Sequence, residues 1–191
     1  MAELVEAHRY SEKRLARAEA RLARLEEQME MVIDQVAVLT IAVGDIQGTL
    51  LEEQYRRNAS AYFGRIIRKV RVLSSQQLAD LLDQAYDRGE IAWNEREEVL
   101  LCDVVMRGRS RDDNTPLYVM AEVSLGIGQE DVDRAVRRAQ ILQRVVEIPV
   151  IPAVAGRRID PLIDEYARDK GVWRVVNGHV VPPDQPTDRS T

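Results

Sequence analysis

Apolar residues recur at alternating spacings of three and four from Leu15 to Leu50. This heptad pattern predicts one coiled-coil helix about 54 Å long. Arg14 and Glu19 flank the apolar seam. In a parallel pair of chains, Arg14 of one helix can reach Glu19 of the other. We therefore expect a parallel homo-oligomer. The residues expected in its seam are Leu15, Leu22, Leu25, Met29, Val32, Val36, Leu39, Val43 and Ile46.

The apolar stripe widens between Val32 and Ile46, where the charged residues are Asp34 and Asp45. A wide stripe favours more than two strands in the coil, or a globular domain folded against the helix. The alternative for the whole segment is one amphipathic helix packed on its own domain. Because that alternative leaves the flanking charges unexplained, assembly between chains is preferred.

Two apolar runs, residues 99–106 and 117–124, are joined by a polar loop and predict the neighbouring strands of a hairpin. Each run holds one carboxylate, Asp103 in the first and Glu122 in the second. A carboxylate in apolar surroundings is costly unless it is paired or bound to a metal. The two acids are therefore the first candidates for a functional site.

The remaining pattern alternates between helical and strand periods. This alternation predicts an α/β domain with a mixed central sheet flanked by helices over residues 51–176, after a coiled coil over residues 1–50. A polar, proline-rich tail over residues 177–191 is expected to be disordered. Helices are expected over residues 75–87 (capped by Ser74), 129–145 and 159–170, and further strands over residues 149–156 and 172–176.

Helical periodicity is also expected to continue from residue 50 to about residue 71, with an excess of positive charge. The net charge of −5 over 191 residues argues against general affinity for nucleic acid but allows a local basic face. An ordinary solvated helix face is the equally weighted alternative. The candidates for contact with DNA phosphates are Arg56, Arg57, Arg65 and Arg68.

Few residues suit thiol or imidazole chemistry. Cys102 is the single cysteine, and its strand position next to Asp103 predicts a buried, inert thiol. His8 and His179 are far apart, so no His/Cys metal cluster is expected. The charged N-terminus and the absence of a long apolar run predict a cytoplasmic protein without membrane contact.

Period-two alternation places Glu122 and Ser124 on one face of their strand. If Asp103 faces the same side, two carboxylates converge at a strand end. Convergent carboxylates are hard oxygen ligands that suit Mg²⁺ or Mn²⁺. Such an ion would activate water for attack on a phosphodiester. A structural role is the alternative: Asp103 would bind backbone amides, and Glu122 would pair with an arginine of the helix over residues 129–145.

Asp103 and the Glu122-Val123-Ser124 element, with a helix before and after, resemble the PD-(D/E)XK or restriction-endonuclease-like superfamily over residues 50–176. The resemblance implies metal binding by Asp103 and Glu122, with Glu52, or else Glu53, as a third acid. It extends to a bacterial group with an N-terminal coiled coil. The segments that carry this second resemblance are Leu51-Glu52, Arg56-Arg57-Asn58, Tyr62-Phe63, Glu122-Val123-Ser124, Arg137-Arg138-Ala139 and Gly171-Val172-Trp173.

The chain departs from the superfamily at Ser124, where the resemblance implies a catalytic lysine. A serine hydroxyl has no positive charge with which to activate water. Two functions therefore remain open. The first is a metal-dependent nuclease-like protein that binds or cleaves DNA, with Asp103, Glu122 and Ser124 as its catalytic positions. The second is a catalytically inactive nuclease fold that serves as an oligomeric scaffold or interaction module.

Overall fold

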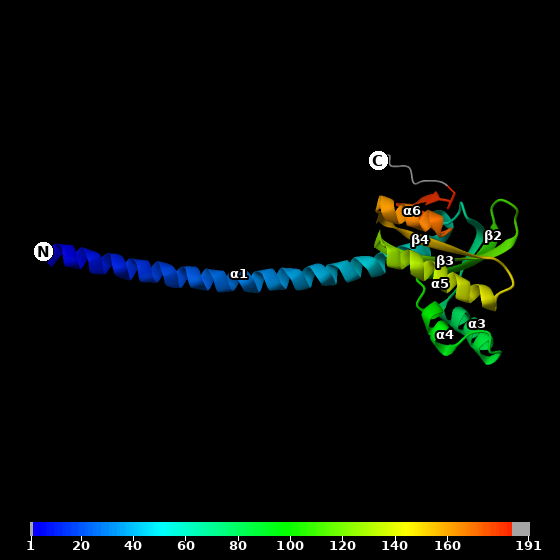
Figure 1. Cartoon of the computed structure of the whole chain (residues 1–191), viewed down its shortest axis with the longest axis horizontal. Coiled ribbons are helices and arrows are strands. Elements are labelled where there is room, and N and C mark those ends of the chain that lie inside the picture. The colour runs from blue at the N-terminus through cyan, green and yellow to red at the C-terminus, as the bar shows by residue number, and fades with distance from the viewer. Residues whose placement is uncertain (1, 185–191) are drawn as a thin grey trace. The chain divides into compact units, whose positions relative to one another are not determined.

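The structure is a computed structural model that describes residues 2–184 (Figure 1). The chain divides into two compact units, Met1–Ile46 and Gln47–Thr191. Helix α1, Ala2–Arg57, forms the first unit and contributes its last turns to the second. The expected long helix followed by an α/β region with a mixed sheet is confirmed. None of the described helices combines the length and apolar character needed to cross a bilayer.

In the first unit α1 is one continuous helix, as the heptad pattern predicts. Its apolar seam is open to solvent in the single chain: Leu22, Leu25 and Met29 are 58%, 60% and 60% exposed. Apolar side chains outside the strict seam are equally open, such as Val38 and Ile41 at 67% each. Assembly through this helix stays a prediction.

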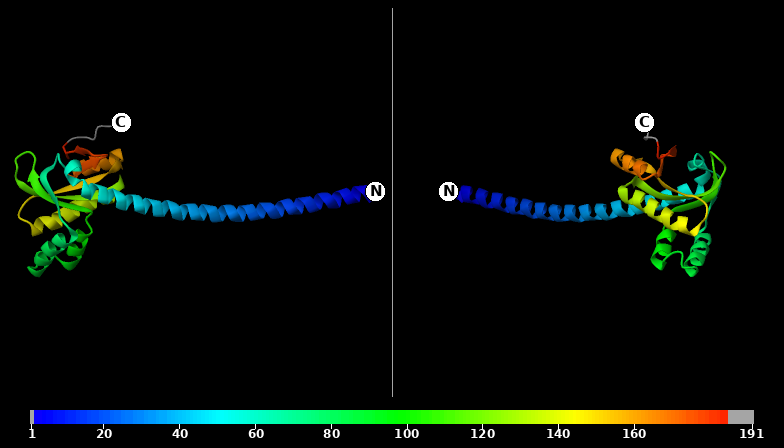
Figure 2. Two further views of the ribbon diagram at one scale, coloured as in Figure 1. Left: turned by 180° about the vertical axis from the view of Figure 1, so that it is seen from behind. Right: turned by 45° about the vertical axis from the view of Figure 1, so that its right-hand side comes forward.

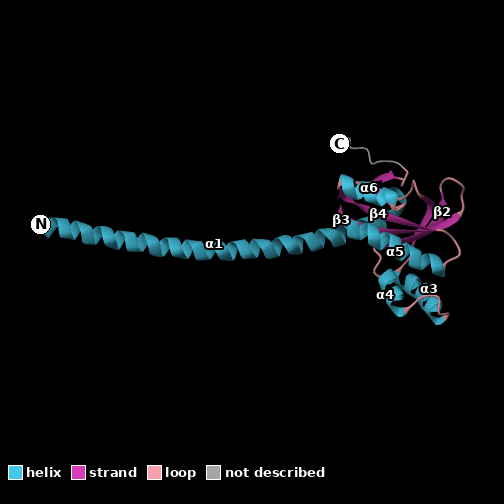
Figure 3. Cartoon of the chain, in the orientation of Figure 1, coloured by secondary structure: helices cyan, strands magenta, loops and turns pink. Residues whose placement is uncertain are grey.

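The second unit is built on a six-stranded mixed sheet whose strands are neighbours in chain order (Figure 3). The pairs β1–β2, β2–β3 and β5–β6 are antiparallel, and the pairs β3–β4 and β4–β5 are parallel. The central strand β3 is buried over most of its length on both faces. The strands are β1 Ile67–Val72, β2 Val104–Ser110, β3 Pro116–Ile127, β4 Val150–Ile159, β5 Trp173–Val176 and β6 His179–Val181.

Helices cover both faces of this sheet (Figure 2). On one face the end of α1 and the short α2 bury Leu51, Tyr55 and Phe63 against the strands. On the other face α5 lies along β3 and β4, and α3 and α4 pack beside α5. The helices after α1 are α2 Ala59–Tyr62, α3 Ser75–Asp87, α4 Trp93–Leu100, α5 Gln129–Val145 and α6 Pro161–Asp169.

Two helix starts follow the rules of capping. The hydroxyl of Ser74 accepts a hydrogen bond from the Gln77 amide, and the Gln77 side chain accepts one from the Ser74 amide. At α6 the carboxylate of Asp160 accepts a hydrogen bond from the Leu162 amide, with Pro161 at the first helical position. The first of these caps was predicted from the sequence.

The helical periodicity expected from residue 50 to about residue 71 is wrong beyond the first turns. Helix α1 ends at Arg57 and α2 at Tyr62, and residues 67–72 form the edge strand β1. Val70 and Val72 pack on the core while Arg71 between them is exposed, which is the period of a strand. A bulge at Lys69, where φ is +54°, interrupts that period and hides it in the sequence.

The hairpin and the tail also need correction. The run over residues 99–106 is not one strand: its first part ends α4 at Leu100, and β2 begins at Val104. The tail expected to be disordered from residue 177 begins with a two-residue turn and strand β6. Asn177 and Gly178 have φ of +49° and +79°, which suits a tight hairpin turn. Residues 185–191 of that tail lie outside the described residues.

Candidate functional site

Asp103 lies in the short connection between α4 and β2, next to the central strand. Its Oδ2 accepts a hydrogen bond of 2.7 Å from the backbone N–H of Val123 on β3. The guanidinium of Arg56 donates to the backbone oxygen of Asp103 at 2.6 Å. The carboxylate thus ties the start of β2 to β3, which is the structural role that the sequence left open.

The pKa of Asp103 is raised from its ordinary 3.8 to about 6. Partial burial is the main cause, and the Val123 hydrogen bond opposes it. The negative charges of Glu122 and of Glu52 raise the pKa further. The three acids predicted as metal ligands therefore lie close enough to interact.

Glu122 lies deep in the domain and is held by two arginines of α5. Its side chain is 2% exposed, and its two carboxylate oxygens lie 2.8 and 2.7 Å from Nη1 of Arg138. Arg134 donates from Nε to the second of these oxygens at 3.2 Å. The Arg138 side chain is 7% exposed, so this is a buried ion pair. Glu122 has the structural role that the sequence offered as the alternative to metal binding.

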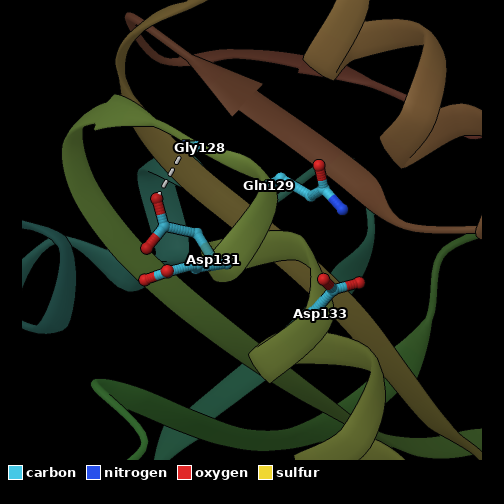
Figure 4. A pocket seen from close by; sticks show the side chains of 5 residues that line it. Gly128, Gln129, Asp131 and Asp133 are labelled. Atoms are coloured by element: carbon cyan, nitrogen blue, oxygen red, sulfur yellow. Dashed lines mark hydrogen bonds between the residues drawn. The ribbon is translucent and has the colours of Figure 1, made fainter.

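The arginines are themselves positioned by further contacts. Nη1 of Arg138 also donates to the backbone oxygen of Leu101 at 2.9 Å, while its Nε is a buried nitrogen without a hydrogen-bond partner among the described residues. Arg134 pairs with Asp131, whose carboxylate accepts from the Gly128 N–H at 2.8 Å (Figure 4). Residues 131, 134 and 138 share one face of α5 because they are three and four apart.

A hollow of about 500 Å³ lies at the start of α5 (Figure 4). Gln129 and Asp133 are among the residues that line it, beside the Gly128–Asp131 hydrogen bond. Asp133 also accepts a hydrogen bond of 2.7 Å from the hydroxyl of Tyr166 on α6. The Asp133 carboxylate therefore joins α5 to α6, which accounts for its place in this hollow.

The acid cluster does not fit a divalent cation as it stands. A cation on Glu122 would have to displace Arg138 and Arg134 and leave a buried guanidinium without its partner, which is strongly unfavourable. Ser124 supplies no charge, and its hydroxyl donates to the backbone oxygen of Gly126 at 2.9 Å. Within the described part of the chain, no group of three or more His, Cys, Asp or Glu side chains is placed to hold a metal.

The arginines predicted to contact phosphates fall into two groups. Arg56 is bound to the backbone at Asp103, and Arg57 pairs with Glu53 at 3.1 Å. Arg65 and Arg68 lie outside α1, at the start of the sheet, and both are exposed. The sequence had placed all four residues on one helix, and this expectation is wrong.

Cys102 is buried beside the same cluster, as predicted. Burial raises the pKa of its thiol well above the ordinary value, and the charges of Glu122 and Asp103 raise it further. A thiol with a raised pKa carries little thiolate and is a poor nucleophile. Its Sγ lies 3.6 Å from the backbone oxygen of Ala121, so the thiol, in the connection before β2, faces the central strand.

Comparisons with protein-family models, with curated proteins and with solved structures gave no match.

Proposed function

We propose that residues 51–176 form a nuclease-like domain that is catalytically inactive and acts by association, and that α1 assembles it into a parallel homo-oligomer. The buried pair of Glu122 and Arg138 carries this proposal. An arginine on both oxygens of the central acid supplies the positive charge that a metal would otherwise bring. The superfamily resemblance accounts for the acids, and the arginines account for the loss of the metal.

Two further contacts support an inactive domain. The carboxylate of Asp103 accepts a backbone N–H, so it already has a role in joining β2 to β3. The hydroxyl of Ser124, at the position of the implied lysine, is directed to a backbone oxygen of its own strand. Each group of the resembling motif is thus explained by a protein contact.

Calorimetry with Mg²⁺ and Mn²⁺ at neutral pH tests the inactive domain. We expect no saturable binding by the wild type and no cleavage of plasmid DNA. Asp103→Ala and Glu97→Ala serve as the site variant and the exposed control. Saturable binding that Asp103→Ala removes and Glu97→Ala keeps would contradict the proposal. It would then favour a metal-dependent nuclease, the second candidate, whose supporting observation is that the charges of Glu52 and Glu122 both act on Asp103.

Assembly is tested by the molar mass of the full chain in solution. Light scattering is expected to give a multiple of the 21.7 kDa chain mass. Leu25→Asp with Leu39→Asp places charges in the apolar seam and should lower the mass to that of one chain. Glu27→Ala, on the opposite side of the same helix, should leave the mass unchanged. If the wild type has the molar mass of a single chain, assembly through α1 is refuted.

A further inference from the structure

Four arginines stand in two directly opposed pairs on one face of the sheet. In the antiparallel register of β1 and β2, Arg68 faces Arg109 and Arg71 faces Arg107. Residues opposite each other in an antiparallel pair have side chains on the same face, and so do residues two apart on one strand. All four side chains are exposed. The result is a compact basic surface, which we call the arginine face.

Directly opposed like charges destabilise a sheet. Within the described residues none of the four arginines forms an ion pair that would offset this. Arg68 and Arg109 donate to Asn114, at 3.2 Å to its side-chain oxygen and 2.8 Å to its backbone oxygen. The guanidinium of Arg107 lies 5.8 Å from the centre of the Tyr118 ring. These neutral contacts hold Arg68, Arg107 and Arg109 in place and leave their charge uncompensated.

Two exposed arginines of α5 behave differently. Arg137 and Arg144 pair with Glu98 and Glu95 of α4. Further exposed cations, Arg65, Lys69 and Arg111, lie on the same strands and their connections, where the exposed acids are Asp112 and Asp113. A concentration of positive charge in a chain of net charge −5 is a marked asymmetry. Such asymmetry is typical of a surface that meets a polyanion.

Protection of a sheet edge explains only part of this surface. Charged residues on an edge strand prevent pairing with another sheet, and β1 is such an edge. Arg107 and Arg109 lie on β2, which is paired on both sides. Their charge therefore needs another explanation.

We infer that the arginine face binds the phosphate backbone of nucleic acid. Guanidinium groups bind phosphate oxygens bidentately and keep their charge at all physiological pH values. No large apolar side chain of residues 65–72 or 107–116 is among the exposed ones, so the surface lacks the anchors that insert into a lipid layer. Tyr118 is 6% exposed and unavailable for stacking on bases. Contact through phosphates alone gives binding without sequence preference.

This inference rests on the proposed function, because it gives the interaction module its partner. An oligomer would present several copies of the arginine face to one nucleic acid. Linked copies raise the overall affinity well above that of a single face. Weak individual contacts by four arginines would then suffice.

The test is fluorescence anisotropy of a labelled DNA duplex with the full chain, in the presence of a chelator and over a series of salt concentrations. Arg107→Gln with Arg109→Gln is the test variant, and Arg137→Gln with Arg144→Gln is the control, which removes two exposed arginines of α5. We expect the test variant to weaken binding at least tenfold and to lower the salt slope by about 2. Circular dichroism checks that both variants fold.

The pair on the other strand gives a second, independent variant. Arg68→Gln with Arg71→Gln should reproduce the loss of affinity. Equal binding by the wild type, both test variants and the control would overturn the inference. Binding to vesicles of phosphatidylserine and phosphatidylcholine, without binding to the duplex, would also overturn it.

The outcomes for the two proposals are separate. If the wild type cleaves DNA with Mg²⁺ while loss of the arginine face still weakens duplex binding, the inactive domain is refuted and the arginine face stands. If no metal binds and duplex binding is insensitive to Arg107 and Arg109, the inactive domain stands and the arginine face is refuted.

Discussion

Replacing Asp103 by Asn is expected to stabilise the protein at neutral pH. The Asp103 carboxylate is partly buried and lies near the negative charges of Glu122 and Glu52. At pH 7 it is ionised, and its charge disfavours the folded state. Asparagine has nearly the same shape, and its side-chain oxygen can accept the hydrogen bond of the Val123 amide. The substitution therefore removes the unfavourable charge and keeps the contact.

The magnitude follows from the pKa of Asp103, which is about 6 in the folded protein against an ordinary value of 3.8. That difference corresponds to about 3 kcal/mol at 1.36 kcal/mol for each tenfold change in the proton affinity. Solvent screening at this partly exposed group reduces the expected gain to about 1–2 kcal/mol. Because the folded-state pKa is raised, the stability of the wild type should fall as pH rises from about 4 to about 6 and then level off.

The assay is urea unfolding of the wild type and of Asp103→Asn at one protein concentration, repeated from pH 4 to pH 7. Asp169→Asn, at a side chain that is 68% exposed, is the control and should change the free energy of unfolding by less than about 0.5 kcal/mol. The stability lost by the wild type between pH 4 and pH 6 should be smaller in Asp103→Asn. A variant less stable than the wild type at pH 7 would refute the reasoning.

Two further predictions concern the core and the ion pair. Arg138→Met should destabilise the fold by about 3 kcal/mol in urea unfolding, because Glu122 keeps its buried charge and loses its main partner. Adding Glu122→Leu should restore most of the lost stability. Full stability of the Arg138→Met variant would argue against the ion pair. Leu82→Ala, at a fully buried side chain of α3, should cost about 2–5 kcal/mol, whereas Leu162→Ala, at a 75% exposed side chain, should lie within about 0.5 kcal/mol of the wild type in the same measurement.

The sequence predicts those elements whose signals are local. The bounds of α3 and α5 match the expectation because each has an apolar stripe of helical period and recognisable end signals, such as Ser74 before α3. Strands β1 and β6 were missed, and for β1 the reason is that its main support is non-local. β1 is defined by pairing with β2 across an inserted helical pair, and its bulge breaks the alternation. For β6 a local signal did exist, since Asn177-Gly178 is a typical hairpin turn.

The sequence was sufficient to predict which residues form the candidate site, but not which groups they bind. The apolar context of Asp103 and Glu122 correctly indicated groups that need partners, and the charges of Glu122 and Glu52 both raise the pKa of Asp103. From the sequence alone, a metal ion and an arginine are equally good candidates for the group that neutralises a buried carboxylate. The spacing of three and four between Asp131, Arg134 and Arg138 was a signal for the second solution. Choosing between them required the register of α5 over β3.

The buried arginine also changes what the acids can show about function. Loss of Glu122 would leave Arg138 charged, buried and without its partner, so the acid is needed for stability whether or not the domain is catalytic. Asp103 differs, because an uncharged side chain of the same shape could keep its contact with the Val123 amide. The presence of Glu122 is therefore no evidence of catalysis in this chain. Function is better sought on the arginine face, where opposed like charges lower stability and where protection of the sheet edge explains only the pair on β1.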